Sequence, residues 1–138
     1  DALATLHRLV DIFPADQHPQ IAALVAENLR GILSQQLLPR ADDHGQVLAS
    51  ELLVNTPAVA NLIRNRRFHL LQNLMQTGAS HGIYTMDQSV LSLYLNEYIT
   101  IETAIENLES VENMRRVRAI AEQRAEQEQG SEETPAKE

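Results

Sequence analysis

Apolar residues recur at helical spacing over most of the chain. From Leu3 to Phe13 they come every three or four residues, and the pattern ends at Pro14, which disfavours helix in the residue before it. A second stripe begins near Asp16, so we expect two helices that share one core. The apolar positions of this second stripe are Ile21, Leu24, Val25, Leu29, Ile32 and Leu33.

The spacing changes after this stripe. Two apolar runs, residues 37–38 and 47–54, flank the turn-forming residues 41–45, which read Ala-Asp-Asp-His-Gly. Two such runs around an Asp/Gly turn predict a β-hairpin or a pair of strands. It is the only sheet that the sequence predicts.

Clear start signals mark the helices that follow. The Thr56 hydroxyl can cap a first turn, and Pro57 suits the first helical position, where a backbone N–H would have no partner. Thr85 and Gln88 have the spacing of a capping box. The remaining helices are expected to begin near Phe68, Thr100 and Val111. The sequence therefore predicts an α+β fold that is mainly α.

The helix predicted after Thr56 has a divided surface. One narrow face carries Val59, Leu62 and Ile63, which we expect to point into the core. The opposite face is expected to point outward and consists of Ala60, Asn61 and Arg64.

A cluster of basic residues ends this helix. Arg64, Arg66 and Arg67, here called the basic island, have His69 close by in the sequence. Clusters of this kind are most often solvated surface. Their guanidinium groups can instead make charge-assisted contacts to acidic groups on a partner or a neighbouring subunit, so both interpretations stay open.

Composition narrows the classes of function. A chain of 138 residues with 43% apolar content corresponds to about one domain with a packed core. The net charge of -8 argues against a nucleic-acid binder, because phosphate contacts need a basic surface, and half of this excess lies in residues 119–138. The sequence has no cysteine, which excludes disulfides and thiolate zinc sites, and no apolar run long enough for a membrane span.

Candidate chemistry is sparse. The sequence contains no GxxxxGKS/T phosphate loop, no GxGxxG fingerprint and no GxSxG elbow, and its five histidines lack metal-ligand spacing. Asp42 and Asp43 either hold a cation or accept backbone N–H bonds within the turn. Residues 76–82, Gln-Thr-Gly-Ala-Ser-His-Gly, are either a loop that a partner approaches closely or a plain connection between helices.

One segment resembles a known motif. Residues 56–64, Thr-Pro-Ala-Val-Ala-Asn-Leu-Ile-Arg, are similar to the AIRNLIRE motif of the PilT/PilU family, the twitching-motility ATPases of type IV pili. Further segments resemble the family in the same order, so the similarity covers roughly residues 1–108. They are residues 8–14 (Arg-Leu-Val-Asp-Ile-Phe-Pro), 34–40 (Ser-Gln-Gln-Leu-Leu-Pro-Arg), 51–57 (Glu-Leu-Leu-Val-Asn-Thr-Pro) and 76–89 (Gln-Thr-Gly-Ala-Ser-His-Gly-Ile-Tyr-Thr-Met-Asp-Gln-Ser).

This resemblance implies the C-terminal helical portion of a RecA-like P-loop NTPase domain. In the family, six subunits form a ring in the cytoplasm, peripheral to the inner membrane at the pilus base, and ATP with Mg²⁺ powers pilus retraction. The Walker A loop, Walker B segment and histidine box lie upstream of the Phe13-Pro14 position, and His7 lies too close to Phe13 to belong to that box. We therefore expect no catalytic, cofactor-binding or metal-ligating residue here, and no ATPase activity of the chain alone.

The resemblance also implies partners and site residues. The partners are a homo-hexamer, formed through parts outside this chain, and the inner-membrane platform proteins of the pilus; neither nucleic acid nor direct membrane insertion is expected. Ala60 stands where the motif has its first Arg, and Gln36 where the family often has Arg, so the roles of those cations are not implied here. The retraction motif maps to Ala58, Val59, Ala60, Asn61, Leu62, Ile63 and Arg64, and the candidate partner contacts are Arg64, Arg66 and Arg67.

The expected organisation has three parts. They are part of the RecA-like domain over residues 1–110, a C-terminal helix over residues 111–129 and a disordered acidic tail over residues 130–138. Because the chain starts at Asp1 inside a helical pattern and without Met, we expect a segment of a longer protein.

Related motors are separated by the connection at residues 41–45. It is tight and lacks the cysteine-rich insertion of extension and secretion ATPases, which favours the retraction class. Residues 107–115 resemble PilU slightly more than PilT. Two alternatives stay open: a non-catalytic binding module of the pilus machinery, and a fragment of a related type IV secretion or conjugation motor.

Overall fold

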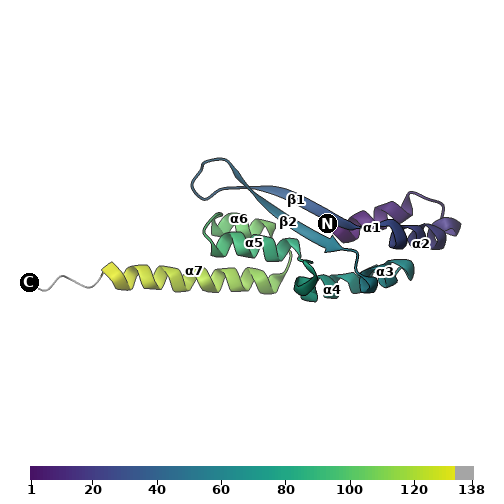
Figure 1. The fold of residues 1–138 in the computed structure, drawn as a ribbon. Helices are drawn as coiled ribbons and strands as arrows, with labels where there is room; N and C mark the ends of the chain where they lie inside the picture. Colours follow the sequence, from purple (N-terminus) through teal and green to yellow (C-terminus); the bar gives the residue numbers. More distant parts are fainter. Residues whose placement is uncertain (133–138) are drawn as a thin grey trace, which may run out of the picture. The chain divides into compact units, whose positions relative to one another are not determined.

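The computed structural model describes residues 1–132 and shows helices with one two-stranded antiparallel sheet (Figure 1). The prediction of a mainly helical α+β fold with one hairpin is confirmed. No helix within residues 1–132 has the length and apolar character needed to cross a bilayer. The elements are α1 (Ala2–Asp11), η1 (Ala15–Gln17), α2 (His18–Asn28), β1 (Gly31–Pro39), β2 (Gln46–Val54), α3 (Pro57–Arg64), η2 (Phe68–Leu70), α4 (Leu71–Thr77), η3 (Gly78–His81), α5 (Met86–Leu95), α6 (Ile101–Asn107) and α7 (Val111–Glu132), where η marks a 3-10 helix.

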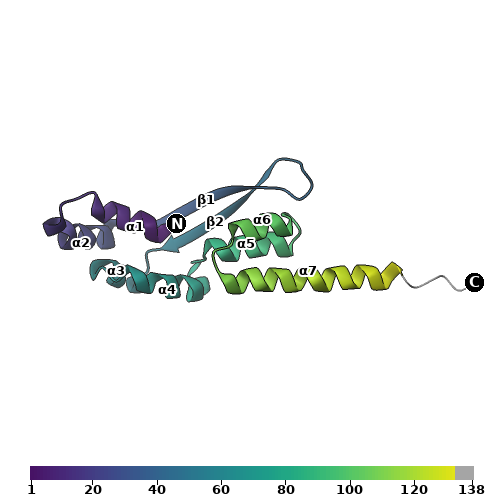
Figure 2. The same ribbon diagram turned by 180° about the vertical axis from the view of Figure 1, so that it is seen from behind.

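The chain forms two compact units. Unit 1 comprises Asp1–Gln36 and Leu48–Ser89, and unit 2 comprises Leu37–Val47 and Val90–Glu138. The base of the hairpin therefore belongs to unit 1 and its tip to unit 2. In unit 1, α3 packs against α2, as the views from both sides show (Figures 1 and 2). The core of unit 1 consists of Ala2, Leu6, Val10, Ala26, Ile32, Leu53, Val59, Ile63, Phe68, Leu71, Met75 and Ile83.

The second predicted apolar stripe was wrong at its end. α2 stops at Asn28, and Ile32 and Leu33 lie in β1. The side-chain amide of Asn55 donates hydrogen bonds to the carbonyls of Ala26 (2.9 Å) and Leu29 (2.8 Å), which satisfies acceptors that the last helical turn leaves open. The apolar spacing of a helix happens to continue into β1. The end of α2 could not be read from that spacing, because the donor that satisfies its carbonyls comes from Asn55, far along the chain.

The predicted helix caps are confirmed. The Thr56 hydroxyl accepts the Val59 N–H at 3.3 Å at the start of α3. Thr85 and Gln88 form the capping box of α5: the Thr85 N–H donates to Gln88 Oε1 (2.9 Å) and the Gln88 N–H donates to Thr85 Oγ1 (3.2 Å). α6 starts in the same way, with Thr100 as the capping residue.

Unit 2 contains the long helix α7. Val117 on this helix is fully buried, and α7 packs against α6. The helix begins at Val111, as expected, and continues to Glu132, beyond the expected end at Gln129. The rest of the tail that we predicted to be disordered, residues 133–138, lies outside the described residues. The three-part organisation of the chain remains a prediction.

A buried carboxylate links β2 to the first residues of α1 and α5. Glu51 on β2 is 6% exposed, and its Oε1 accepts the Ala2 N–H at 2.7 Å while Oε2 accepts the Met86 N–H at 3.3 Å. These N–H groups open α1 and α5, and the first N–H groups of a helix have no partner within the helix. The negative charge also suits the positive end of each helix. One side chain thus ties the starts of α1 and α5 to β2.

We predict that Glu51→Gln lowers the free energy of unfolding by about 2 kcal/mol, because the amide keeps one acceptor oxygen and turns an N–H₂ group toward the other backbone donor. Urea denaturation followed by circular dichroism measures the change. Glu27→Gln, at an exposed position of α2, is the matched control and should change stability by less than about 0.5 kcal/mol. Equal effects of the two substitutions would contradict a structural role for the Glu51 carboxylate.

Candidate functional site

The inner face of α3 anchors the helix in unit 1. Val59 and Ile63 are fully buried and Leu62 is partly buried, as the spacing predicted. Ala60 differs from the prediction, because it is partly buried and packs against the core instead of pointing outward. α3 is contacted by α2, α4 and η2, so more of its surface is covered than a single apolar face would require.

This packing leaves a narrow exposed strip on α3. It consists of Ala58, Asn61, Arg64 and Asn65, which we call the outer strip. Residues three and four apart lie on one side of a helix, so these side chains follow one another along its length. Four of the seven residues of the predicted retraction motif are thus packed inward, and the remaining three, Ala58, Asn61 and Arg64, face solvent.

A hollow of about 400 Å³ lies at the start of the outer strip. The structure brings together here two segments that the sequence marked separately, the first residues of α3 and the glycine-containing residues 76–82. An antiparallel bridge between Leu52 and Tyr84 holds the end of the second segment against β2. The hollow is lined by Thr56, Pro57, Ala58, Leu74, Thr77, Gly78, Ser80, His81 and Ile83.

The two glycines of this segment have different roles. α4 ends at Thr77, directly before Gly78, but Gly78 has φ -82 and does not need a left-handed backbone. A Cβ at this position would lie 2.8 Å from the Cβ of Ile83, so the glycine is required by close packing. Gly82 is the residue with the left-handed backbone, at φ 73, where the chain turns back after η3.

A second hollow, of about 310 Å³, lies beside the other end of the strip. Its imidazoles are held in place: His18 Nε2 donates to the Phe13 carbonyl at 2.7 Å, and the His7 ring meets Phe68 edge to face at 4.8 Å. The hollow is lined by His7, Val10, Asp11, His18, Asn65, Arg66 and Phe68. We did not predict this group, because its members come from α1, α2, the end of α3 and the start of η2, and no sequence spacing connects them.

The end of α3 has strained backbone geometry. The Arg66 N–H donates to the Ile63 carbonyl (2.9 Å) and the Arg67 N–H donates to the Leu62 carbonyl (2.8 Å), the paired bonds of a Schellman motif. Arg66 occupies the left-handed position of this motif with φ 54. Glycine is the usual residue there, since a side chain at positive φ meets the following carbonyl.

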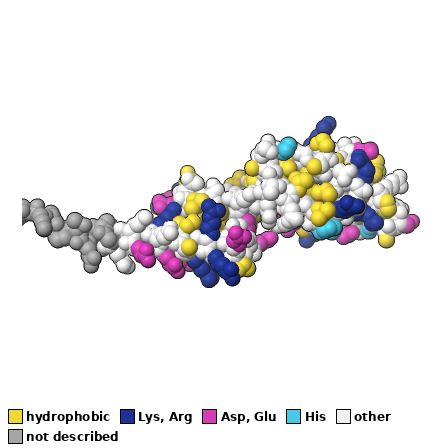
Figure 3. Space-filling model, turned by 90° about the horizontal axis from the view of Figure 1, so that it is seen from below, with side chains coloured by type: hydrophobic (Ala, Val, Ile, Leu, Met, Phe, Trp, Pro, Cys, Tyr) yellow, Lys and Arg dark blue, Asp and Glu magenta, His cyan; other side chains and the backbone are white. Residues whose placement is uncertain are grey.

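The basic island is exposed on the surface of unit 1. The side chains of Arg64, Arg66 and Arg67 are all exposed. Figure 3 shows Lys and Arg side chains in dark blue close to histidines in cyan on the face that it draws. Within residues 1–132, none of the three guanidinium groups has a carboxylate within ion-pair distance, and the ion pairs found there involve Arg40 and Arg124. The island therefore has hydrogen-bond donors available to a partner, although its role in binding remains a prediction.

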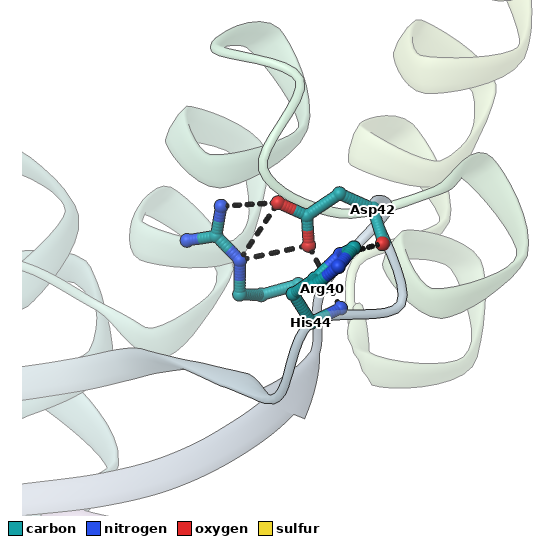
Figure 4. A network of polar contacts seen from close by, with 3 residues as sticks. All are labelled: Arg40, Asp42 and His44. Atoms are coloured by element: carbon teal, nitrogen blue, oxygen red, sulfur yellow. Dashed lines mark hydrogen bonds and ion pairs between the residues drawn. The ribbon is translucent and has the colours of Figure 1, made fainter.

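The hairpin turn uses its acidic residue internally. Both oxygens of Asp42 accept from the Arg40 guanidinium, the shortest distance being 2.6 Å, and Oδ1 also accepts the His44 N–H at 3.0 Å (Figure 4). These bonds lower the pKa of Asp42 to about 2, the Arg40 hydrogen bond contributing most. Of the two interpretations of this turn, acceptance of backbone N–H bonds is the one that the geometry of Asp42 supports.

Comparison with solved structures identifies the class of protein. The chain is similar to the crystal structure of the pilus retraction motor PilT with bound ADP, with a TM-score of 0.72 and 39% identity over 83% of this chain and 32% of that chain. The Legionella pneumophila ATPase DotB, at a TM-score of 0.64 and 18% identity over 75% of this chain and 28% of that chain, shares the fold. The described elements are therefore part of a RecA-like ATPase fold. No family model matches the chain.

Curated relatives narrow the class to one family. The chain is 38% identical to a twitching motility protein of Neisseria gonorrhoeae over 80% of this chain, and 38% identical to the type IV pilus ATPase PilU of Pseudomonas aeruginosa over 78%. It is 34% identical to the type IV pilus ATPase PilT of Pseudomonas aeruginosa over 76%. Most of the chain is thus homologous to a part of the PilT/PilU proteins, and it belongs to their family. It spans 30% to 31% of the length of these relatives.

We predict that Arg40→Gln raises the pKa of Asp42 from about 2 toward its ordinary value of 3.8, because the largest cause of the lowering is removed. The hydrogen bond from the His44 N–H should still lower the pKa of Asp42 in part. A carboxyl group whose pKa is lowered by folding stabilises the folded state at pH values above its ordinary pKa. This stabilisation is lost as the pH falls toward 2. Carboxyl chemical shifts followed by NMR measure the pKa. Arg30→Gln is the control and should leave the pKa of Asp42 unchanged. An unchanged pKa in Arg40→Gln would contradict the assignment of Arg40 as the main cause of the lowering.

We predict that Arg66→Gly stabilises the protein by up to about 1 kcal/mol, since glycine removes the cost of a side chain at positive φ. Arg67→Gly is the matched control: Arg67 has φ -90, so glycine there only increases the freedom of the unfolded chain and should destabilise. Urea denaturation of both variants gives the comparison. Destabilisation by Arg66→Gly would show that this arginine makes contacts that outweigh the backbone strain.

Proposed function

We propose that this chain is the C-terminal part of the motor domain of a hexameric ATPase that retracts type IV pili, and that α3 couples ATP hydrolysis to retraction. The observation that carries the proposal is the homology to proteins named for twitching motility, PilU and PilT over most of the chain. The retraction motif expected from the sequence falls on α3, whose outer strip connects two hollows.

In this proposal, ATP is bound and hydrolysed by a part of the motor outside this chain. The sequence contains no GxxxxGKS/T loop, so ATP and Mg²⁺ are bound by another part of the motor. A relative with bound ADP supports the use of nucleotide by the parent protein. In this proposal, the ring lies in the cytoplasm at the inner-membrane base of the pilus and acts on the platform proteins there.

The packing of α3 suits a transmitting element. Val59 and Ile63 have no exposed surface, so the helix moves with the core of unit 1 and does not slide independently. A displacement of that core on hydrolysis would carry the outer strip with it. Asn61 and Arg64 present an amide and a guanidinium group in fixed order, and both can donate hydrogen bonds to acidic or carbonyl groups of a partner.

A chimera tests the proposal. We predict that Pseudomonas aeruginosa PilU, with its matching segment replaced by this chain, hydrolyses ATP and supports twitching in a strain without its own PilU. Arg64→Ala in the chimera should reduce twitching by about tenfold or more, as loss of a charge-assisted hydrogen bond would, while ATPase activity changes by less than about twofold.

Arg30→Ala is the matched control, because Arg30 is exposed on unit 1 but lies outside α3. It should leave both activities at the level of the chimera. Equal loss of twitching and ATPase activity in Arg64→Ala would contradict a coupling role, and a chimera that assembles and hydrolyses ATP but never retracts pili would contradict the assignment to the retraction class.

A further inference from the structure

The hollow of about 310 Å³ in unit 1 is lined by two side chains of opposite charge that do not contact each other. Asp11 is the last residue of α1, Arg66 follows the end of α3, and both are exposed. The carboxylate of Asp11 and the guanidinium of Arg66 are farther apart than an ion pair, since the pairs found within residues 1–132 involve Arg40 and Arg124. The space between them can therefore admit a ligand that contacts both charges.

Both charged residues occupy positions that the local backbone disfavours. Arg66 has φ 54, at a position where glycine is the usual residue. Asp11 lies at the C-terminal end of α1, where the helix dipole repels a carboxylate and favours a basic side chain. Local stability therefore explains neither charge. Residues that break a local rule without an internal gain are expected at functional sites.

The rest of the lining suits a small ligand that both donates and accepts hydrogen bonds. His18 Nε2 donates to the Phe13 carbonyl at 2.7 Å, so Nδ1 of the neutral ring is an acceptor, and the amide of Asn65 contains both kinds of group. Val10 and Phe68 are 2% and 5% exposed and give the hollow an apolar base. Its volume is at the lower end of the range of small-molecule sites, about 300–1,000 Å³.

We propose that this hollow binds a free amino acid with an apolar side chain, whose carboxylate pairs with Arg66 and whose ammonium group pairs with Asp11. A guanidinium group binds a carboxylate through two parallel hydrogen bonds, and an ammonium group donates to a carboxylate. A zwitterion also matches the lining in charge, because Asp11 repels a simple anion and Arg66 repels a simple cation. The inference goes beyond the proposed function and does not rest on it.

Binding is expected to be weak and to stabilise unit 1. Both charged partners are exposed, and exposed ion pairs contribute little each, so we expect a dissociation constant on the order of 1 mM. The bound amino acid connects the end of α1 with the end of α3. A ligand that binds only the folded chain raises its stability, so occupation of the hollow holds these two helix ends together.

An NMR titration of the 138-residue chain with L-valine tests the proposal. The backbone amide signals of Asp11, His18 and Arg66 should shift and reach saturation. Isovalerate, which is valine without its ammonium group, and isobutylamine, which is valine without its carboxylate, should each bind about fivefold or more weakly, because each leaves one charge of the hollow without a partner.

Substitutions of the two charged residues separate binding from stability. Arg66→Gly, which we predict to be more stable than wild type, should bind L-valine about fivefold or more weakly, and so should Asp11→Asn. A purely structural role of Arg66 would not lower affinity while stability rises. Asp11→Asn tests the site independently if Arg66→Gly changes the fold of the helix end.

Arg30→Gln and Glu27→Gln are the matched controls, since each removes a charge of the same sign at an exposed position of unit 1 outside the hollow. Their dissociation constants for L-valine should stay within about twofold of wild type. Signals of the hollow that do not shift at about 10 mM L-valine, tenfold above the expected dissociation constant, would overturn the proposal. Equal binding of isovalerate would also overturn it, as would tighter binding of phosphoethanolamine, which has the same pair of charges in a lipid headgroup.

Discussion

Glu51 joins the beginning, middle and end of unit 1 through two hydrogen bonds. Its carboxylate lies on β2 and accepts the first backbone N–H groups of α1 and α5. An isolated two-stranded hairpin is marginally stable in water, so β1 and β2 depend on the helices that cover them. The helices depend in turn on the strand for a partner to their opening N–H groups. Removing this acceptor affects all three elements, because within residues 1–132 no other side chain accepts both N–H groups.

The segment before α5, within unit 1, then determines the surroundings of α3. The residues before α5 are held to β2 by the bridge between Leu52 and Tyr84, next to Glu51. This places Gly78 and Ile83 close together and puts the segment beside the first residues of α3. α2 packs against α3, and the outer strip is the surface that remains. The candidate site is thus a consequence of how the core packs around α3. The helix backbone that carries it is held by Val59 and Ile63 on the opposite, buried side.

Charge is distributed unevenly over this scaffold. In unit 2, Arg124 is satisfied by Glu97 and by backbone and ring contacts, and in the hairpin turn Arg40 is satisfied by Asp42. In unit 1, the basic island has no acidic partner among the described residues. The net charge of the protein is -8, yet three arginines without an ion-pair partner in residues 1–132 lie at the end of one helix, one of them at φ 54. This surface is suited to an acidic partner.

Local chemistry in the sequence determined the helix starts, the hairpin turn and the family, because caps, turns and motifs depend on residues a few positions apart. Thr56, Thr85 and Thr100 cap the helices that they predicted, and the segment around Ala58 pointed to the PilT/PilU proteins found by comparison. Only the tertiary structure decided where α2 ends, that Ala60 is packed inward and that Glu51 bonds to two helices. Each of these depends on a partner far away along the chain, and helical or strand periodicity carries no information about such partners.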